Sequence, residues 1–162
     1  MADIFDGGLG QHLKKLTPEE NVIRTAAFYR ILDGNRSNID DLTIETGLTT
    51  GKVQKTMKGL VQRGIMVLDE KGDVVGSHGL SLVPTEHRLS INGWELFTWC
   101  AADAVGIPAA LGVNAKVSSK CFQCHNPIEI EMVNGEIRYC NREDACIWVI
   151  AADFGRSIVG CT

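Results

Sequence analysis

Apolar residues recur at helical spacing through the first part of the chain. Thr17-Pro18-Glu19-Glu20 has the features of a helix start: an N-cap residue, Pro at N1 and acidic side chains that complement the helix dipole. Gly34 is the matching stop signal, and Val53, Met57 and Leu60 share one face of a later helix. The pattern predicts three helices, over residues 17–34, 38–45 and 51–63.

Two extended runs follow, Ile65 to Asp69 and Val74 to Val75, joined by a Lys71-Gly72-Asp73 turn. Three helices followed by a small hairpin is the pattern of a winged helix-turn-helix. We therefore expect a flexible N-terminus over residues 1–16 and a winged-helix-like domain over residues 17–76.

The rest of the chain, residues 77–162, is expected to form a second domain. It begins with a mostly extended junction up to Leu96, and Trp94 to Val105 reads as a helix ended by Gly106 and Pro108. Asn134-Gly135 is the strongest hairpin signal in the chain. The expected strands span residues 115–118, 128–133, 136–139 and 146–152. The predicted fold class is α+β, with the three-helix winged part followed by a helix and a small, mostly antiparallel sheet.

Composition and charge narrow the function classes. The 162 residues are 44% hydrophobic and 22% charged, which is typical of globular proteins. The net charge of -4 argues against a protein that binds nucleic acid by bulk electrostatics. No apolar run is long enough to span a bilayer, so no membrane partner is expected.

All six cysteines lie in the C-terminal part, at positions 100, 121, 124, 140, 146 and 161. The first ten residues, MADIFDGGLG, contain neither the basic nor the apolar region of a signal peptide. We therefore expect a cytoplasmic protein whose thiols are free for metal binding or catalysis, although an exported chain with this count would suggest disulfides.

The sequence Trp99-Cys100-Ala-Ala-Asp103 places a thiol and a carboxylate three residues apart, so that on a helix they would be neighbours. A carboxylate raises the pKa of a nearby thiol, which disfavours a simple nucleophile. It suits a site where a bound soft cation displaces the thiol proton and that proton is passed on. The alternative is a buried structural cysteine beside a helix Asp.

A second set of thiols surrounds Cys121-Phe-Gln-Cys124-His125. C-x-x-C is a metal or redox spacing, and together with Cys140 and Cys146 it could supply four thiolates to zinc. The C-x-x-C-H reading as a haem attachment site requires an exported setting, which we do not expect here. Two unrelated turn cysteines are the remaining alternative.

The other candidate residues have simpler readings. Cys146 opens an apolar run and is expected to begin a core strand, where a buried, inert thiol is the plain alternative. Cys161 stands next to the last residue and is a weaker candidate. Lys52, Lys55 and Lys58 recur every third position on the third helix and could contact phosphate, although such a stripe is more often a solvated face. DNA is therefore not the expected partner.

The segment from His78 to Val133 is similar to the alkylmercury (organomercurial) lyase family. The residues that carry the resemblance are Gly79-Leu-Ser-Leu82, Thr85-x-His87-Arg88, Leu96-Phe-Thr-Trp-Cys100-Ala-Ala-Asp103, Pro108, Leu111-Gly112, Ala115-x-Val117-x-Ser119 and Cys121. The family also carries a three-helix winged domain before this segment. The resemblance becomes thin after Val133.

The resemblance implies that two cysteines and one aspartate cleave a carbon–mercury bond. Cys100 and Asp103 match the first cysteine and the aspartate, Cys146 matches the second cysteine, and Cys121 matches a cysteine thought to be structural. Cys124, His125 and Cys140 depart from the family pattern, so that a second thiol cluster that binds zinc or competes for metal is also expected.

The implied mechanism needs no organic cofactor. Two thiolates bind mercury, Asp103 stores a released proton and protonates the leaving carbon, and Hg(II) stays on sulfur until small thiols or a mercuric reductase remove it. Burial against Trp99 or Phe97 would raise the pKa of Asp103 to suit this role. The alternatives are a metal-responsive winged-helix DNA-binding regulator and a lyase-derived soft-metal or zinc-binding protein without turnover.

Overall fold

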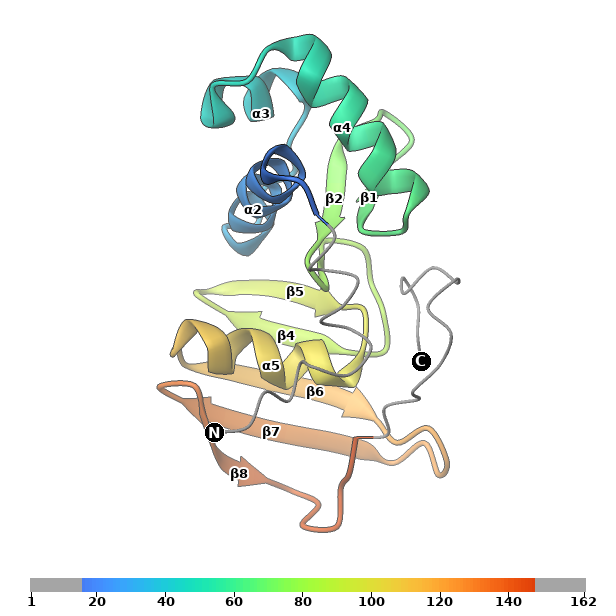
Figure 1. Ribbon diagram of the computed structural model, residues 1–162. Helices are drawn as coiled ribbons and strands as arrows, with labels where there is room; N and C mark the ends of the chain where they lie inside the picture. Colours follow the sequence, from blue (N-terminus) through green and yellow to red (C-terminus); the bar gives the residue numbers. More distant parts are fainter. Residues whose placement is uncertain (1–15, 148–162) are drawn as a thin grey trace.

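Helices and one antiparallel sheet make up the structure, a computed structural model that describes residues 16–147 (Figure 1). The predicted α+β class is confirmed. Three helices gather at one end of the sheet, and a fourth lies along the face of its central strands (Figure 1). Most of the expected strand over residues 146–152, and nearly all of the expected flexible N-terminus, lie outside the described residues.

The three N-terminal helices begin and end close to the predicted positions. They are α2 (Pro18–Leu32), α3 (Ile39–Thr46) and α4 (Thr50–Gln62). Thr17 caps α2 through a capping box: its hydroxyl accepts from the Glu20 N–H at 3.2 Å, and the Glu20 carboxylate accepts from the Thr17 N–H at 2.8 Å.

The apolar faces of these helices form the part of the hydrophobic core at the helical end of the molecule. Val53, Met57 and Leu60 of α4 are buried, as their spacing predicts. They belong to one cluster with Ile23 and Ile31 of α2, both of which are completely buried.

Within residues 16–147, one sheet of eight strands runs through both parts of the chain, and every neighbouring pair in it is antiparallel. The strands are β1 (Met66–Leu68), β2 (Val74–Ser77), β3 (Leu80–Ser81), β4 (Arg88–Ile91), β5 (Trp94–Thr98), β6 (Ala115–Lys120), β7 (Pro127–Val133) and β8 (Glu136–Cys140). Their order in the sheet is β1-β2-β3-β5-β4-β6-β7-β8. The predicted hairpin after α4 is present as β1 and β2.

The expected helix over Trp94 to Val105 is wrong in its first half. Trp94–Thr98 is strand β5, which pairs with β4 across an Asn92-Gly93 turn whose residues both have positive φ, 52° and 83°. Helix α5 spans Ala101–Leu111 and lies against the central strands β4, β5 and β6 (Figure 1). Leu96 and Leu89 face each other in the β4–β5 pair and are buried, and this non-local packing outweighs the helical reading.

Pro108 was expected to lie beyond the helix, but α5 continues through it to Leu111. Proline removes one backbone donor inside a helix, and here it is a buried residue of α5. The predicted Asn134-Gly135 turn is confirmed and joins β7 to β8. A Cβ on Gly135 would lie 3.1 Å from the Pro108 carbonyl oxygen, so the tip of this hairpin closes on the end of α5.

No helix within residues 16–147 combines the length and the apolar character that a membrane crossing needs.

Candidate functional site

Cys100 stands at the junction between β5 and α5, as the N-cap residue of α5. Its backbone is extended, with φ -151° and ψ 168°, and its sulfur accepts a hydrogen bond from the Asp103 N–H at 3.4 Å. Asp103 is thus the third residue of the helix, and Cys100 lies just before the helix rather than on it. The predicted proximity of the two residues is found, but it arises from capping geometry.

The two side chains are in direct contact. The Cys100 thiol donates a hydrogen bond to the Asp103 Oδ2 at 3.1 Å. Both residues are half-buried. The proton of the thiol therefore already points at the carboxylate that could take it.

Burial raises the pKa of both the Cys100 thiol and the Asp103 carboxyl. Desolvation, followed by repulsion from Asp103, raises the pKa of the Cys100 thiol from its ordinary value of 9.0 to about 12, although backbone N–H groups oppose this. Desolvation also raises the pKa of Asp103. A thiol with this pKa is protonated at neutral pH, so it is a poor nucleophile until a cation replaces its proton.

Gly79 lies directly against the Asp103 carboxylate. A Cβ at Gly79 would lie 2.6 and 2.7 Å from the two carboxylate oxygens of Asp103, and the φ of Gly79 is +82°. Its carbonyl accepts from the Trp99 N–H at 2.9 Å, which ties this turn to the residue before Cys100. Only glycine leaves room here for the carboxylate.

Replacement of Gly79 by Ala is expected to push the Asp103 carboxylate away from Cys100. A misplacement of about 1 Å at a reacting group can lower a catalysed rate by roughly a hundredfold. We therefore expect turnover to fall by about ten- to a hundredfold in Gly79→Ala, measured at saturating substrate.

Gly93→Ala is the matched control for this substitution. Gly93 has nearly the same φ, +83°, but no atom lies within 4 Å of the position of its Cβ. Both variants place a Cβ on a residue with a strained, left-handed backbone, but only in Gly79→Ala does this Cβ contact Asp103. Equal losses in the two variants would mean that backbone strain, not the carboxylate, is responsible.

The raised pKa of Cys100 predicts slow alkylation. With a pKa of about 12 in place of 9.0, this thiol holds about a thousandfold less thiolate at neutral pH. Its rate of reaction with iodoacetamide, followed by peptide mass spectrometry, should rise about tenfold per pH unit until the pH approaches this pKa.

Two comparisons test this assignment. Asp103→Asn removes the neighbouring carboxylate and should make Cys100 react faster at neutral pH. Cys121, whose pKa is lowered by backbone hydrogen bonds, should react well before Cys100. Labelling of Cys100 ahead of Cys121 in the unmodified protein would contradict the assignment.

The structure does not bring Cys146 to this pair. Cys146 lies after β8, is exposed and belongs to no strand. The expectation that it begins a core strand is therefore wrong at this position, and so is the alternative of a buried, inert thiol. No group of three or more His, Cys, Asp or Glu side chains suited to a metal occurs within residues 16–147. Cys161 lies outside the described residues.

The four-thiolate zinc site expected from Cys121, Cys124, Cys140 and Cys146 is not assembled either. Cys140 pairs with Ile130, three residues along β7 from Pro127, which corresponds to roughly 10 Å from the turn that carries Cys121. Its thiol donates to the Arg142 carbonyl at 3.2 Å. All the cysteines of the described part carry free thiols.

Gly79 belongs to the motif that carries the family resemblance, but its place beside Asp103 was not predicted, and neither was the role of His78 in the same turn. The His78 ring lies 5.5 Å from the Phe28 ring, and burial with the nearby Arg24 charge lowers the pKa of His78 to about 4. This neutral imidazole packs the Gly79 turn against α2. The available signal was the turn-forming pair His78-Gly79 between two apolar runs, where both residues take positive φ.

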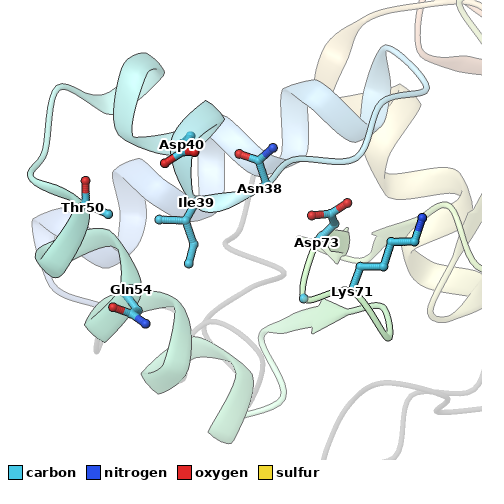
Figure 2. A pocket seen from close by; sticks show the side chains of 8 residues that line it. Asn38, Ile39, Asp40, Thr50, Gln54, Lys71 and Asp73 are labelled. Carbon is cyan, nitrogen blue, oxygen red and sulfur yellow. The ribbon is translucent and has the colours of Figure 1, made fainter.

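An open pocket of about 350 Å³ lies at the other end of the molecule, between α3, α4 and the β1–β2 turn (Figure 2). Its lining contains no thiol and no histidine, so the Cys100 chemistry does not take place there. It is lined by Asn38, Ile39, Asp40, Thr50, Gln54, Lys71, Gly72 and Asp73. Lys52, Lys55 and Lys58 are exposed on α4 but do not line it.

The family model and the relatives that match this chain bear the same description, alkylmercury lyase. The family model described as alkylmercury lyase matches residues 80–162, about half of the chain. An alkylmercury lyase from Bacillus cereus is 30% identical over 125 residues, which cover 77% of this chain and 56% of that protein. An alkylmercury lyase from Pseudomonas putida is 40% identical over 62 residues, 38% of this chain and 29% of that protein.

A solved structure, described as the mercury-bound form of MerB2, superimposes with a TM-score of 0.81 at 31% identity. It covers 90% of this chain and 70% of the other. The chain thus spans just over half the length of the Bacillus cereus protein and more than two thirds of the solved one. From the family match, the shared fold and the level of identity, the chain belongs to the alkylmercury lyase family.

Proposed function

We propose that this protein cleaves the carbon–mercury bond of small organomercurials by protonolysis. The observation that carries the proposal is the 3.1 Å hydrogen bond from the Cys100 thiol to the Asp103 carboxylate. The pair combines a soft ligand for mercury with an acceptor for the proton that mercury displaces. Relatives of this chain bear the name alkylmercury lyase, which supports the same activity.

The first step is exchange of a proton for mercury at sulfur. As R–Hg⁺ binds the Cys100 sulfur, the thiol proton moves along the existing hydrogen bond to Asp103. Burial raises the pKa of this carboxyl, so it can hold the proton better than an exposed aspartate could.

The second step breaks the bond to carbon. A second thiolate binds the same mercury after giving its proton to solvent, and the two sulfurs push electron density toward the carbon. Asp103 then delivers its proton to that carbon. The balance is R–Hg⁺ plus two thiols giving R–H, a dithiolate complex of Hg(II) and one proton. All of these groups belong to the protein or the substrate, and the scheme uses no organic cofactor.

We assign the second thiol to Cys146, with Cys161 as the alternative. Cys146 matches the family's second cysteine, and its exposure leaves the sulfur accessible to mercury already held on Cys100. The assignment requires the segment around Cys146 to approach Cys100 when substrate binds.

Paired serine variants decide between the two thiols. With excess small thiol present, Cys146→Ser should reduce release of R–H by roughly a hundredfold or more, because only one protein sulfur then holds mercury. Cys161→Ser should release R–H at the unmodified rate. The reverse result would move the second thiol to Cys161, and full activity in both single variants would mean that neither of these two thiols is individually required.

Three further proposals concern the release of mercury, the compartment in which the protein works and the division of the chain into domains. We propose that Hg(II) leaves to low-molecular-weight thiols or to a mercuric reductase, and that the protein works in the cytoplasm, as its free thiols favour. We also propose that residues 17–76 act as a winged-helix-like domain and residues 77–162 as the catalytic domain. The helices α2 to α4 followed by the β1–β2 hairpin support this division.

A further inference from the structure

The turn between β6 and β7 brings two thiols together outside the Cys100 site. The Cys121 N–H donates to the Asn126 carbonyl at 2.9 Å, and the Cys121 carbonyl accepts from the His125 N–H at 2.8 Å. His125 takes a left-handed φ of 57°, which folds the turn back on itself. Cys124 is exposed and Cys121 is half-buried, so the pair opens to solvent.

The Cys121 sulfur has an environment suited to negative charge. The backbone N–H groups of Cys124 and Gln123, followed by the Cys124 side chain, lower the pKa of the Cys121 thiol. The Arg142 guanidinium, in the loop after β8, lowers this pKa further. N–H donors and a guanidinium stabilise thiolates, and the thiolate is the form that binds metal.

Within the described part of the chain, residues 16–147, no third metal-binding side chain stands beside this pair. The Cys140 thiol donates to the Arg142 carbonyl instead. Zinc sites in proteins almost always take four ligands, so this pair does not suit zinc. Two thiolates alone suit a soft cation that is satisfied by two sulfurs in a line, which is the usual preference of Hg(II).

We infer that Cys121 and Cys124 form a second, two-thiolate binding site for Hg(II), separate from the Cys100–Asp103 pair. The choice of Hg(II) as the cation depends on the proposed function, and the two-sulfur geometry does not. Loading is a ligand exchange without oxidation or reduction: a complex of Hg(II) with two small thiolates exchanges them for the two protein sulfurs, and the two protein protons leave on the small thiols. The site can therefore hold product mercury on the surface, where another thiol can take it up.

The test measures retained mercury in a background without the proposed catalytic thiols. Reduced Cys100→Ser/Cys146→Ser protein is incubated with Hg(II) and excess L-cysteine, desalted, and assayed for metal. We expect about one Hg(II) per chain, because a chelating pair outcompetes single thiols. Adding Cys124→Ser should lower retention at least about tenfold, whereas adding Cys140→Ser should leave it unchanged.

X-ray absorption at the mercury edge provides a second readout that needs no further substitution. It should show two sulfur neighbours on the retained metal. Circular dichroism establishes that each variant is folded. The inference is overturned by unchanged retention in the Cys124→Ser triple variant, by equal loss in the Cys140→Ser variant, by failure of the background protein to retain mercury, or by more than two sulfur neighbours. Because the background protein cannot turn over, none of these results depends on the lyase activity.

Discussion

Asp103→Asn should lower the rate of hydrocarbon release by about a hundred- to ten-thousandfold. The amide keeps the size of the side chain but cannot take the thiol proton or deliver it to carbon. Mercury should still bind, because the sulfur ligands remain. The measurement is the single-turnover rate of R–H release by gas chromatography, together with the mercury retained on the protein.

Asp40→Asn is the control for this substitution, since Asp40 is exposed on α3 and lines the pocket at the far end of the molecule. It should keep the full rate. A rate in Asp103→Asn within a few-fold of the unmodified protein would mean that solvent protonates the carbon and that the carboxylate only positions the thiol.

Cys100→Ser should abolish release of hydrocarbon, with a loss of at least about a thousandfold, because a hydroxyl is a hard ligand with little affinity for mercury. This substitution should leave the fold undisturbed. Cys100 caps α5 by accepting the Asp103 N–H, and serine is among the best N-cap residues. The variant should therefore fold with a thermal midpoint equal to or above that of the unmodified protein.

Cys140→Ser provides the matched control, since it removes a thiol that bonds only to the Arg142 carbonyl in the structure. We expect it to retain normal turnover. If Cys100→Ser released hydrocarbon at the normal rate while folded, sulfur at this position would have no part in the reaction.

The N-terminal helices were predictable because their signals are local. The capping box at Thr17 begins α2 and the left-handed Gly34 follows its end, both close to the expected positions. The β7–β8 hairpin was predictable from Asn134-Gly135 for the same reason. In each case, residues close together in sequence determine the backbone.

The region around Trp94 was not predictable in this way. Asn92-Gly93 is also an Asn-Gly pair, but the apolar residues after it fit a helix as well as a strand. Pairing of β5 with β4 and β3 decides the outcome, and those contacts cannot be seen from one segment alone.

In the candidate site, too, the local features were predictable from the sequence and the long-range contacts were not. The spacing of Cys100 and Asp103 predicted that they would meet, and they do, although through a cap rather than two helical positions. The close approach of Gly79 to Asp103 depends on a turn 24 residues earlier in the chain, so spacing could not reveal it. The four thiols of the predicted zinc site do not come together, because the strand register places Cys140 away from the Cys121 turn.

The most direct measurement of the central claim is hydrocarbon release in heavy water. Reduced protein is incubated in D₂O with an organomercurial and excess thiol, and the headspace is analysed by mass spectrometry. Delivery of an exchangeable proton from Asp103 predicts R–D with a single deuterium, released steadily by the unmodified protein and at least about a hundredfold more slowly by Asp103→Asn or Cys100→Ser. Absence of hydrocarbon from the unmodified protein, or equal release from the Cys100→Ser variant, would contradict it.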